Sequence, residues 1–178
     1  MNALETLAAD VVNFVKDNQA WAPYIVAMLC FAESLAVISF FVPATVMLVG
    51  IGGLIGASGL PFWPIWFGAV IGAVLGDWLS YAVGHYFKES AHTHWPLSRY
   101  PEFTKRADEF TRKWGALGVF IGRFSGPLRA FVPLAAGVFA VPHWKFQLAN
   151  ITSAIVWGFV LLAPGWGLFK YISQYLPH

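Results

Sequence analysis

The sequence contains few charged residues and a single cysteine. Only 11% of its 178 residues are charged, against about 25% in a soluble globular domain. So few ionisable side chains cannot cover a soluble surface, and we therefore expect an integral membrane protein. The lone cysteine excludes an intramolecular disulfide, and the net charge of +2 is too small to indicate nucleic-acid binding. No secretory signal peptide is expected, because the start lacks a basic region followed by a compact apolar one.

Apolar residues, in contrast, make up 58% of the chain. A transmembrane helix needs about 20 of them in succession, and residues 62–87 and 145–170 each meet this requirement. Both ranges predict a full span, which Pro164 should kink or end in the second. Small residues recur every four positions in the first span and predict a surface where another helix packs closely; they are Gly68, Gly72, Gly76, Ser80 and Gly84.

Two further apolar stretches are broken by helix-disrupting residues. Residues 24–60 contain Pro43, and residues 117–141 contain Gly126, Pro127 and Pro133. The first stretch is too long for one span and too short for two, and the second is broken by glycine and proline in a similar way. We therefore expect each to form a re-entrant hairpin of two short helices, which must be covered by protein or line a wet cavity.

The remaining segments are polar or amphipathic. Residues 1–20 predict an amphipathic helix at the membrane interface. Residues 88–114 predict a polar loop with a surface helix, and its six Lys and Arg residues indicate the cytoplasmic side. His92 and His94 lie there without a Cys/His cluster, so no metal site is expected. Residues 1–178 thus form one membrane domain, with the tryptophans interpreted as interfacial or packing residues.

Short repeats suggest that the two halves of the chain are related. Phe-Val-Pro occurs at 41–43 and again at 131–133, and "LPFW" at 60–63 resembles "VPHW" at 141–144. Each half then reads as a hairpin followed by a full span. One span separates the hairpins, so they should enter from opposite faces, as in transporters with inverted repeats. The predicted fold is therefore an all-α integral membrane protein with two re-entrant hairpins and two transmembrane helices in an inverted repeat.

Four charged residues interrupt the apolar segments: Glu33, Asp77, Arg123 and Arg129. Each would cost about 2.5–3.5 kcal/mol if unpaired at the centre of a membrane helix. They should therefore be paired, or face a water-filled cavity. Two interpretations stay open: structural ion pairs that hold the hairpins together, or a substrate site open to a headgroup.

The choice of arginine favours the substrate site. A guanidinium group binds phosphate through two parallel hydrogen bonds and stays charged. The neighbouring glycines and prolines free backbone N–H groups that also suit an anion. Glu33 and Asp77 should pair with the arginines when the site is empty, and either acid could carry a proton; the sequence does not decide between them.

Two motifs resemble the DedA family of bacterial membrane proteins, which share a domain with eukaryotic lipid scramblases of the VTT type. Gly76, Asp77, Tyr81 and Gly84 match its Gly-Asp-x-x-x-Tyr-x-x-Gly pattern. Arg123, Pro127 and Arg129 match its Arg-x-x-x-Pro-x-Arg pattern, and Glu33 matches the acid of the first hairpin. The resemblance covers about residues 24–170.

The resemblance implies a non-enzymatic transporter of the bacterial inner membrane, multi-pass and without cofactors or metal. Its substrate would be a phosphate-headed lipid, undecaprenyl phosphate or a phospholipid, moved with or without protons. Arg123 and Arg129 would bind the phosphate. Glu33 and Asp77 would serve proton coupling or ion pairing, and the site would be lined by Pro43, Thr45, Tyr81, Gly126 and Pro127. A homo-oligomer is left open, and Thr45 stands where many members have a second acid, which weakens proton coupling.

Three other functions use the same residues differently. A proton-coupled small-ion or drug antiporter would place the charges around another ligand. An intramembrane aspartyl protease would need a second catalytic carboxylate motif, and none is evident; His143 likewise lacks the partners of a phosphatase nucleophile. An envelope assembly factor would depend on packing at Gly72 and Gly76 rather than on the charges. His85, one turn beyond Tyr81, is either a hydrogen-bonding residue or a proton relay.

Overall fold

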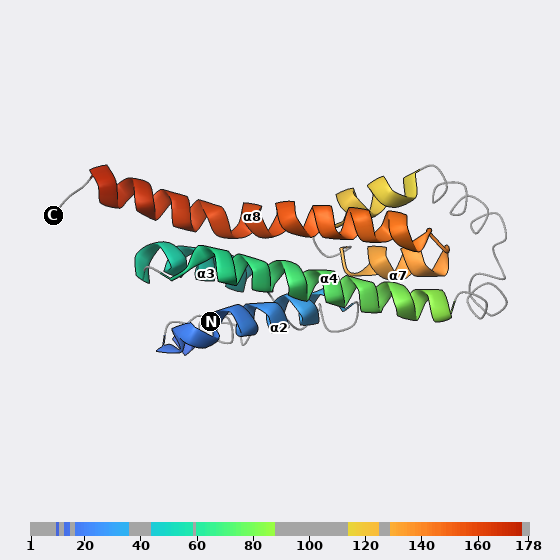
Figure 1. Cartoon of the computed structure of the whole chain (residues 1–178), viewed down its shortest axis with the longest axis horizontal. Coiled ribbons are helices and arrows are strands. Elements are labelled where there is room, and N and C mark those ends of the chain that lie inside the picture. The colour runs from blue at the N-terminus through green and yellow to red at the C-terminus, as the bar shows by residue number, and fades with distance from the viewer. Residues whose placement is uncertain are drawn as a thin grey trace.

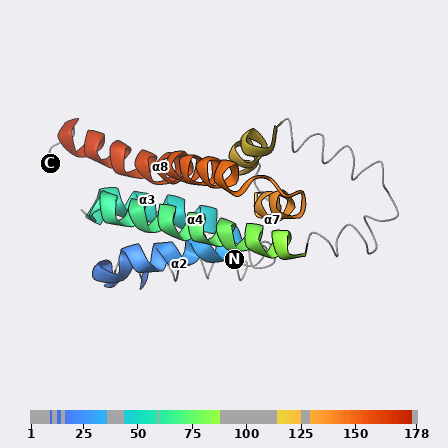
Figure 2. The ribbon, with the colours of Figure 1, turned by 45° about the vertical axis from the view of Figure 1, so that its right-hand side comes forward.

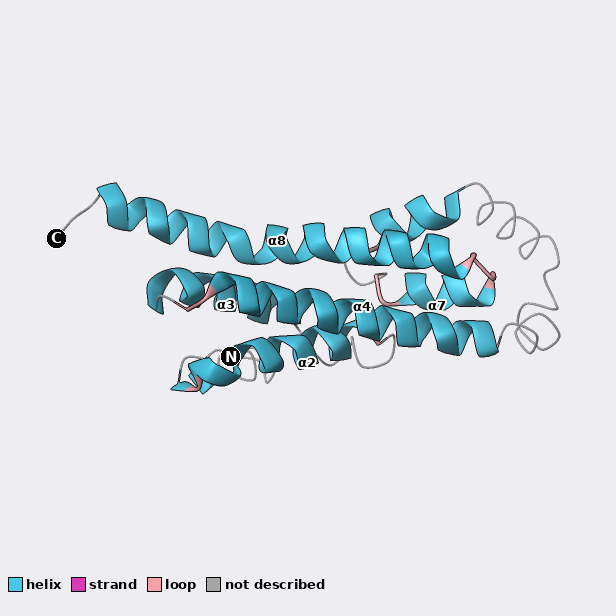
Figure 3. Ribbon diagram, viewed as in Figure 1, coloured by secondary structure: helices cyan, strands magenta, loops and turns pink. Residues whose placement is uncertain are grey.

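The structure is a computed structural model that describes residues 10, 13–14, 17–35, 44–58, 60–87, 114–124 and 129–175. Every regular element in these ranges is helical (Figures 1 and 3), which confirms the predicted all-α class. Residues 114–122 are also helical. The named elements are η1 (Gln19–Trp21), α2 (Ala22–Ser34), α3 (Ala44–Ser58), α4 (Phe62–Tyr86), α7 (Phe131–Val138) and α8 (His143–Tyr175).

Two long apolar helices, α4 and α8, run through the molecule (Figure 1). The segments Phe62–Tyr86 and His143–Gly167 are each 25 residues long and apolar enough to cross a membrane. At 1.5 Å per residue such a segment extends about 37 Å, more than the roughly 30 Å hydrocarbon core. Both predicted long helices are therefore confirmed. Pro64 fits in the first turn of α4, where its missing N–H needs no partner, and α8 continues past Pro164.

The short helix α2 packs along the first half of α4. A Cβ atom at Gly72 would overlap the carbonyl of Ala27, and one at Gly68 would overlap the carbonyl of Pro23. Since the residue numbers of the contacting partners increase together along the two helices, α2 and α4 run parallel. The glycine spacing of α4 is thus used for the close backbone approach that it predicts.

The second half of α4 is covered by α7. Gly84 lies against Leu134, and Gly137 lies against the carbonyl of Tyr81. The contacts run in opposite order along the two helices, so α7 is antiparallel to α4. On α8, α3 covers the C-terminal half, where Gly165 lies against the backbone of Gly52. The two views in Figures 1 and 2 agree that α2 and α3 occupy one end of the long helices and α7 the other.

Two apolar clusters form the core, one at each end. The first joins α2, α3, the first half of α4 and the later part of α8. The second joins Tyr81, Val119, Ala136, Val141, Phe146 and Ala149. Buried polar residues lie between them along both long helices: Asp77 comes between Ala73 and Tyr81, and Asn150 comes between Phe146 and Ala154. A polar layer therefore divides the core near its middle.

Several predictions concern residues outside the described ranges. These are the tips of both hairpins, 36–43 and 125–128, the polar segment 88–113 and most of the N-terminal helix. Pro43, Gly126, Pro127, His92 and His94 belong to this set. The re-entrant hairpins, the interfacial helix and the cytoplasmic loop stay predictions.

Candidate functional site

The polar layer brings together the four charges that the sequence singles out. The structure pairs Asp77 with Arg123 and Glu33 with Arg129. All four side chains are buried, as are four uncharged polar ones: Ser34, Ser80, Asn150 and Ser153. The expected pairing of acids with arginines is therefore observed.

The short helices position the charges by where they begin and end. Glu33 is the last residue but one of α2, and Arg129 comes two residues before α7. Arg123 directly follows helical residues 114–122. Asp77 instead projects from within α4, where the small residues beside it leave space. Glu33, Arg123 and Arg129 thus lie at or beside the ends of short helical segments, next to the middle of the long helices α4 and α8.

Arg123 is held by a nearly complete set of partners. It forms an ion pair with Asp77, its Nε donates to Ser153 Oγ at 2.9 Å, and its Nη2 donates to Asn150 Oδ1 at 2.6 Å. Only 4% of the residue is exposed, and Nη1 alone lacks a hydrogen-bond partner among the described residues. Arg123 is therefore fixed between α4 and α8.

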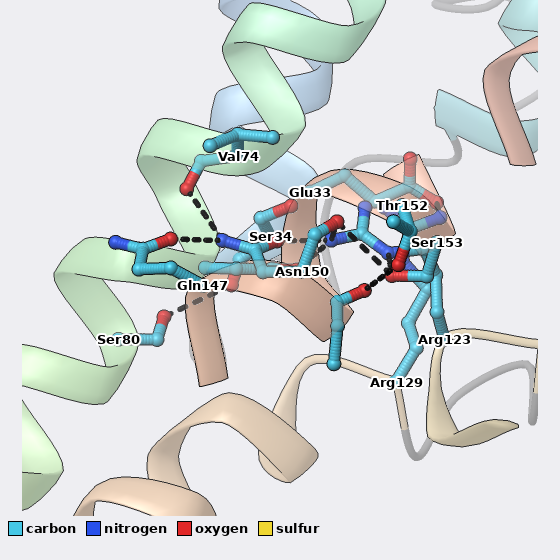
Figure 4. A network of polar contacts seen from close by, with 12 residues as sticks. Glu33, Ser34, Val74, Ser80, Arg123, Arg129, Gln147, Asn150, Thr152 and Ser153 are labelled. Carbon is cyan, nitrogen blue, oxygen red and sulfur yellow. Dashed lines mark hydrogen bonds and ion pairs between the residues drawn. The ribbon is translucent and has the colours of Figure 1, made fainter. Parts of the chain in front are cut away.

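Asn150 connects this arginine to the opposite helix. Its Nδ2 donates to the carbonyl of Val74 at 3.1 Å and to Gln147 Oε1 at 3.3 Å. Figure 4 shows Asn150 between Val74 and Arg123. A further bond joins α2 to α4, since Ser80 Oγ donates to the carbonyl of Ser34 at 3.0 Å. The polar layer thus crosslinks three helices.

Arg129 is held differently. Its Nη1 lies 3.4 Å from Glu33 Oε1, and its guanidinium carbon lies 4.2 Å from the centroid of the Trp157 ring. The residue is 8% exposed. Neither Nη1 nor Nη2 has a hydrogen-bond partner among the described residues. Arg129 is consequently a buried cation with unused donors, which is costly unless something accepts from them.

Glu33 interacts with Arg129 and also with Thr45 of α3. Thr45 Oγ1, near the start of α3, donates to Glu33 Oε1 at 2.8 Å. Glu33 Oε2 has no hydrogen-bond partner in the described part of the chain. Thr45 stands where a second acid was expected in the family pattern, and here it supplies a donor to the remaining acid.

The remaining site predictions have mixed outcomes. Of the two interpretations of the charges, the structure shows the ion pairs, with both arginines buried; a substrate site at the arginines stays a prediction. An apolar groove of about 700 Å³ lies on the outer side of α2, lined by residues that include Tyr24, Met28 and Leu29. The Tyr81 hydroxyl donates to the carbonyl of Val141 at 2.6 Å, and its ring stacks on Phe146. Tyr81 therefore connects α4 to the segment that joins α7 to α8 and to the start of α8.

Sequence reasoning missed Asn150, Ser153 and Trp157. Asn150 and Ser153 lie three residues apart in an apolar span, so they share one face of α8. Buried polar groups need partners, and that spacing was the available signal. Trp157 was interpreted as a packing residue, and only the position of Arg129 distinguishes it from the other tryptophans. No group of three or more His, Cys, Asp or Glu that could hold a metal ion occurs among the described residues.

Comparison with known proteins adds the family. The family model of the VTT domain matches residues 42–167. The chain is 31% identical over 153 residues to the inner membrane protein YabI of Escherichia coli, a match that covers 86% of this chain and 60% of the relative. It is 30% identical over 155 residues to an uncharacterized membrane protein of Buchnera aphidicola, with 87% and 60% covered.

A similar protein also occurs in Mycobacterium tuberculosis. An uncharacterized membrane protein of Mycobacterium tuberculosis is 34% identical over 121 residues, which cover 65% of this chain and 56% of the relative. The chain thus spans about 60% of the length of the first two relatives. No solved structure matches it. The match to YabI confirms the predicted inner-membrane localisation.

Proposed function

This chain belongs to the VTT-domain (DedA) family of membrane proteins, and on that premise we propose that it moves a phosphate-headed lipid across the bacterial inner membrane. The observation that carries the proposal is the buried guanidinium group of Arg129, whose two terminal nitrogens have no hydrogen-bond partner among the described residues. Arginine recognises phosphate through two parallel N–H donors. A lipid phosphate would supply the acceptors that the empty site lacks.

The lengths of the short helices support a site at mid-membrane depth. Helices α2 and α3 contain 13 and 15 residues, which corresponds to about 20 and 22 Å and is less than the roughly 30 Å hydrocarbon core. Each reaches only part of the way along a long helix and ends or begins near a buried charge. Re-entrant hairpins in an inverted repeat would have this arrangement, with the substrate site where their tips meet.

The packing of the two halves is consistent with the same plan. In the first half, α2 lies on α4 and α3 lies on α8. In the second half, α7 lies on α4, and Val119 of helical residues 114–122 joins Phe146 of α8 in one cluster. The first helix of each hairpin therefore packs on the long helix of its own half, and the second packs on the long helix of the other half. Rocking of one hairpin unit against the other would open the site to alternate sides.

The ion pairs define a cycle for such transport. Without lipid, Arg129 is ion-paired with Glu33. An incoming phosphate replaces the carboxylate at the guanidinium group. Glu33 then keeps its bond from Thr45 and is free to take up a proton. After the lipid leaves on the other side, Glu33 releases that proton to the same side and forms the ion pair with Arg129 again.

The lipid class follows from charge and surroundings. The site offers arginines to a phosphate, while the lipid tail stays in the apolar surroundings of the helices. Undecaprenyl phosphate and phospholipids both have this composition. Neither the headgroup beyond the phosphate nor the direction of movement enters the proposal.

The test is lipid movement in vesicles that contain the purified chain. Two fluorescent lipids with identical tails, one with a phosphate headgroup and one with a neutral sugar headgroup, are compared by the rate at which a membrane-impermeant quencher removes their signal. We expect faster exposure of the phosphate lipid only. Equal rates for both lipids, or no rate above that of protein-free vesicles, would contradict the proposal.

A further inference from the structure

The two buried arginines have unequal surroundings. Arg123 donates to Ser153 and Asn150 and is ion-paired with Asp77. Arg129 has one ion pair, at 3.4 Å, and an aromatic ring beneath its guanidinium group. The sequence motif treats the two arginines as equivalent, but the structure does not.

We infer that Arg129 alone binds the phosphate oxyanion, that Trp157 is the positioning residue that holds its guanidinium group ready, and that Arg123 is a structural crosslink. This inference rests on the proposed function, which leaves open how the two arginines share the task. It assigns a role to a tryptophan that belongs to neither of the sequence motifs.

The argument begins with what a ring under a guanidinium group does. A cation over an aromatic face is stabilised by the quadrupole of the ring, most strongly over tryptophan. That attraction, here with the guanidinium carbon 4.2 Å from the ring centroid, is not a hydrogen bond to an oxygen and does not use up the N–H groups that an oxyanion would accept from. Nη1 and Nη2 of Arg129 are indeed without hydrogen-bond partners among the described residues. Trp157 therefore stabilises the buried charge without occupying the donors that an oxyanion needs.

Trp157 is also fixed in place. It is 5% exposed and belongs to the first apolar cluster, together with Ala154 and Leu162 of the same helix. A ring held on α8 in this way cannot follow the arginine if the arginine moves. The guanidinium group of Arg129 is consequently positioned by a rigid element, although the chain just before it belongs to the hairpin tip.

Arg123 is unsuited to exchange its partners. An incoming phosphate would have to displace Asp77 or Asn150 from Arg123. If Asn150 were displaced, its Oδ1 would lose the hydrogen bond from Arg123, while its Nδ2 stayed bonded to the carbonyl of Val74. Leaving such buried groups unpaired is costly. At Arg129 an oxyanion needs to displace only Glu33, which retains the bond from Thr45. The exchange is therefore easier at Arg129.

The test measures binding to the purified full chain in a neutral detergent by calorimetry. One arm uses dihexanoyl phosphatidic acid as probe, and a second uses inorganic phosphate, so that lipid and free phosphate are distinguished. The variants are Trp157→Leu and Trp157→Phe. Their matched controls are Trp166→Leu and Trp166→Phe, on the same helix and about 13 Å further along it, where the ring stacks on Phe62.

We expect Trp157→Leu to weaken binding of the lipid about tenfold and Trp157→Phe about threefold, because phenylalanine keeps a weaker aromatic face. The Trp166 variants remove the same side chain from a partly buried position beside the same cluster, and they should bind within twofold of the unaltered chain. A lysine keeps the positive charge but lacks the paired N–H donors of a guanidinium group, so Arg129→Lys should weaken binding at least tenfold. Arg123→Lys should instead lower the melting temperature, with binding changed less than threefold.

The outcomes separate the inference from the function. Equal affinities in the Trp157 and Trp166 variants, or a greater loss in Arg123→Lys than in Arg129→Lys, would overturn the inference even if lipid transport were observed. If Trp157→Leu does not fold, Trp157→Phe and the two lysine variants decide. Binding of inorganic phosphate with no added affinity from the lipid tails would keep the Arg129 site and contradict the lipid transporter.

Discussion

Asn150 Oδ1 accepts a hydrogen bond of 2.6 Å from the Arg123 guanidinium group, while its Nδ2 donates to the carbonyl of Val74. One fully buried amide on α8 thus holds both α4 and the end of helical residues 114–122. Both halves of the amide are used, so no substitution by another side chain reproduces the arrangement. The middle of the bundle depends on this residue as much as on the charges.

Replacing Asn150 by Ala should therefore destabilise the protein. The change leaves the Val74 carbonyl without the amide donor and removes an acceptor from Arg123, at about 1–3 kcal/mol for the buried groups left unpaired. Thr152→Ala is the matched control on the same helix, because Thr152 is exposed and its hydroxyl bonds only to the carbonyls of Leu148 and Ala149 within α8. Melting in detergent measures both, and equal melting temperatures would count against the crosslink.

The close approach of α2 and α4 gives a second prediction. Gly72→Ala would push a methyl group into the carbonyl of Ala27, and overpacking of this kind costs about 1–3 kcal/mol. Gly53→Ala provides the comparison, since a Cβ there meets nothing within 4 Å and alanine is favoured in a helix by up to about 1 kcal/mol. We expect a lower melting temperature for the first variant and an unchanged or higher one for the second. The reverse order would show that the helices do not pack through this face.

The Asp77–Arg123 pair should behave as one unit. Removing one partner leaves a buried charge uncompensated, which costs about 3–5 kcal/mol, so Asp77→Asn and Arg123→Met should each be strongly destabilising. The double variant should recover part of the loss, because neither charge is then left alone. A double-mutant cycle on the free energy of unfolding measures this coupling. Additive losses would mean that the two side chains are not paired in the membrane.

Glu33 gives the prediction with a less obvious sign. If its carboxylate competes with phosphate for Arg129, then Glu33→Gln should bind dihexanoyl phosphatidic acid more tightly, by about tenfold, while lipid movement slows because release is impaired. Asp17→Asn is the comparison, because it removes an exposed carboxylate outside the buried charges, and its affinity should change little. Weaker binding by Glu33→Gln would show that the carboxylate supports the site rather than competes for it.

The sequence was sufficient for the helical class, the two long helices and the presence of buried charge. Single ionisable residues in apolar segments need partners of opposite charge. The structure shows two such ion pairs, formed by Asp77 with Arg123 and by Glu33 with Arg129. The glycine spacing of α4 likewise identified a packing face, because a backbone can approach closely only where side chains are small. These features follow from composition and periodicity alone.

The partners of each charge could not be predicted. The two Phe-Val-Pro copies begin at residues 41 and 131, 90 positions apart, and the same offset places Arg123 opposite Glu33 in the two halves. Equivalent positions in a repeat need not be in contact. Whether Trp157 lies under an arginine depends on where the second hairpin meets α8, which no local pattern records. The sequence likewise does not record how deeply each guanidinium group is buried, because burial depends on how the helices pack against one another.

The central claim is that Arg129 binds the phosphate of a lipid that is being moved. Its most direct test is the initial rate of phosphate-lipid movement in vesicles that contain Arg129→Ala combined with Glu33→Gln, so that no acid is left unpaired. Lys145→Ala, at an exposed position near the start of α8, serves as the control for removal of one positive charge. The account predicts a rate reduced to that of protein-free vesicles for the double variant, a slowed but measurable rate for Glu33→Gln alone, and an unchanged rate for the Lys145→Ala control. Undiminished movement in the double variant, with the protein folded, would contradict it.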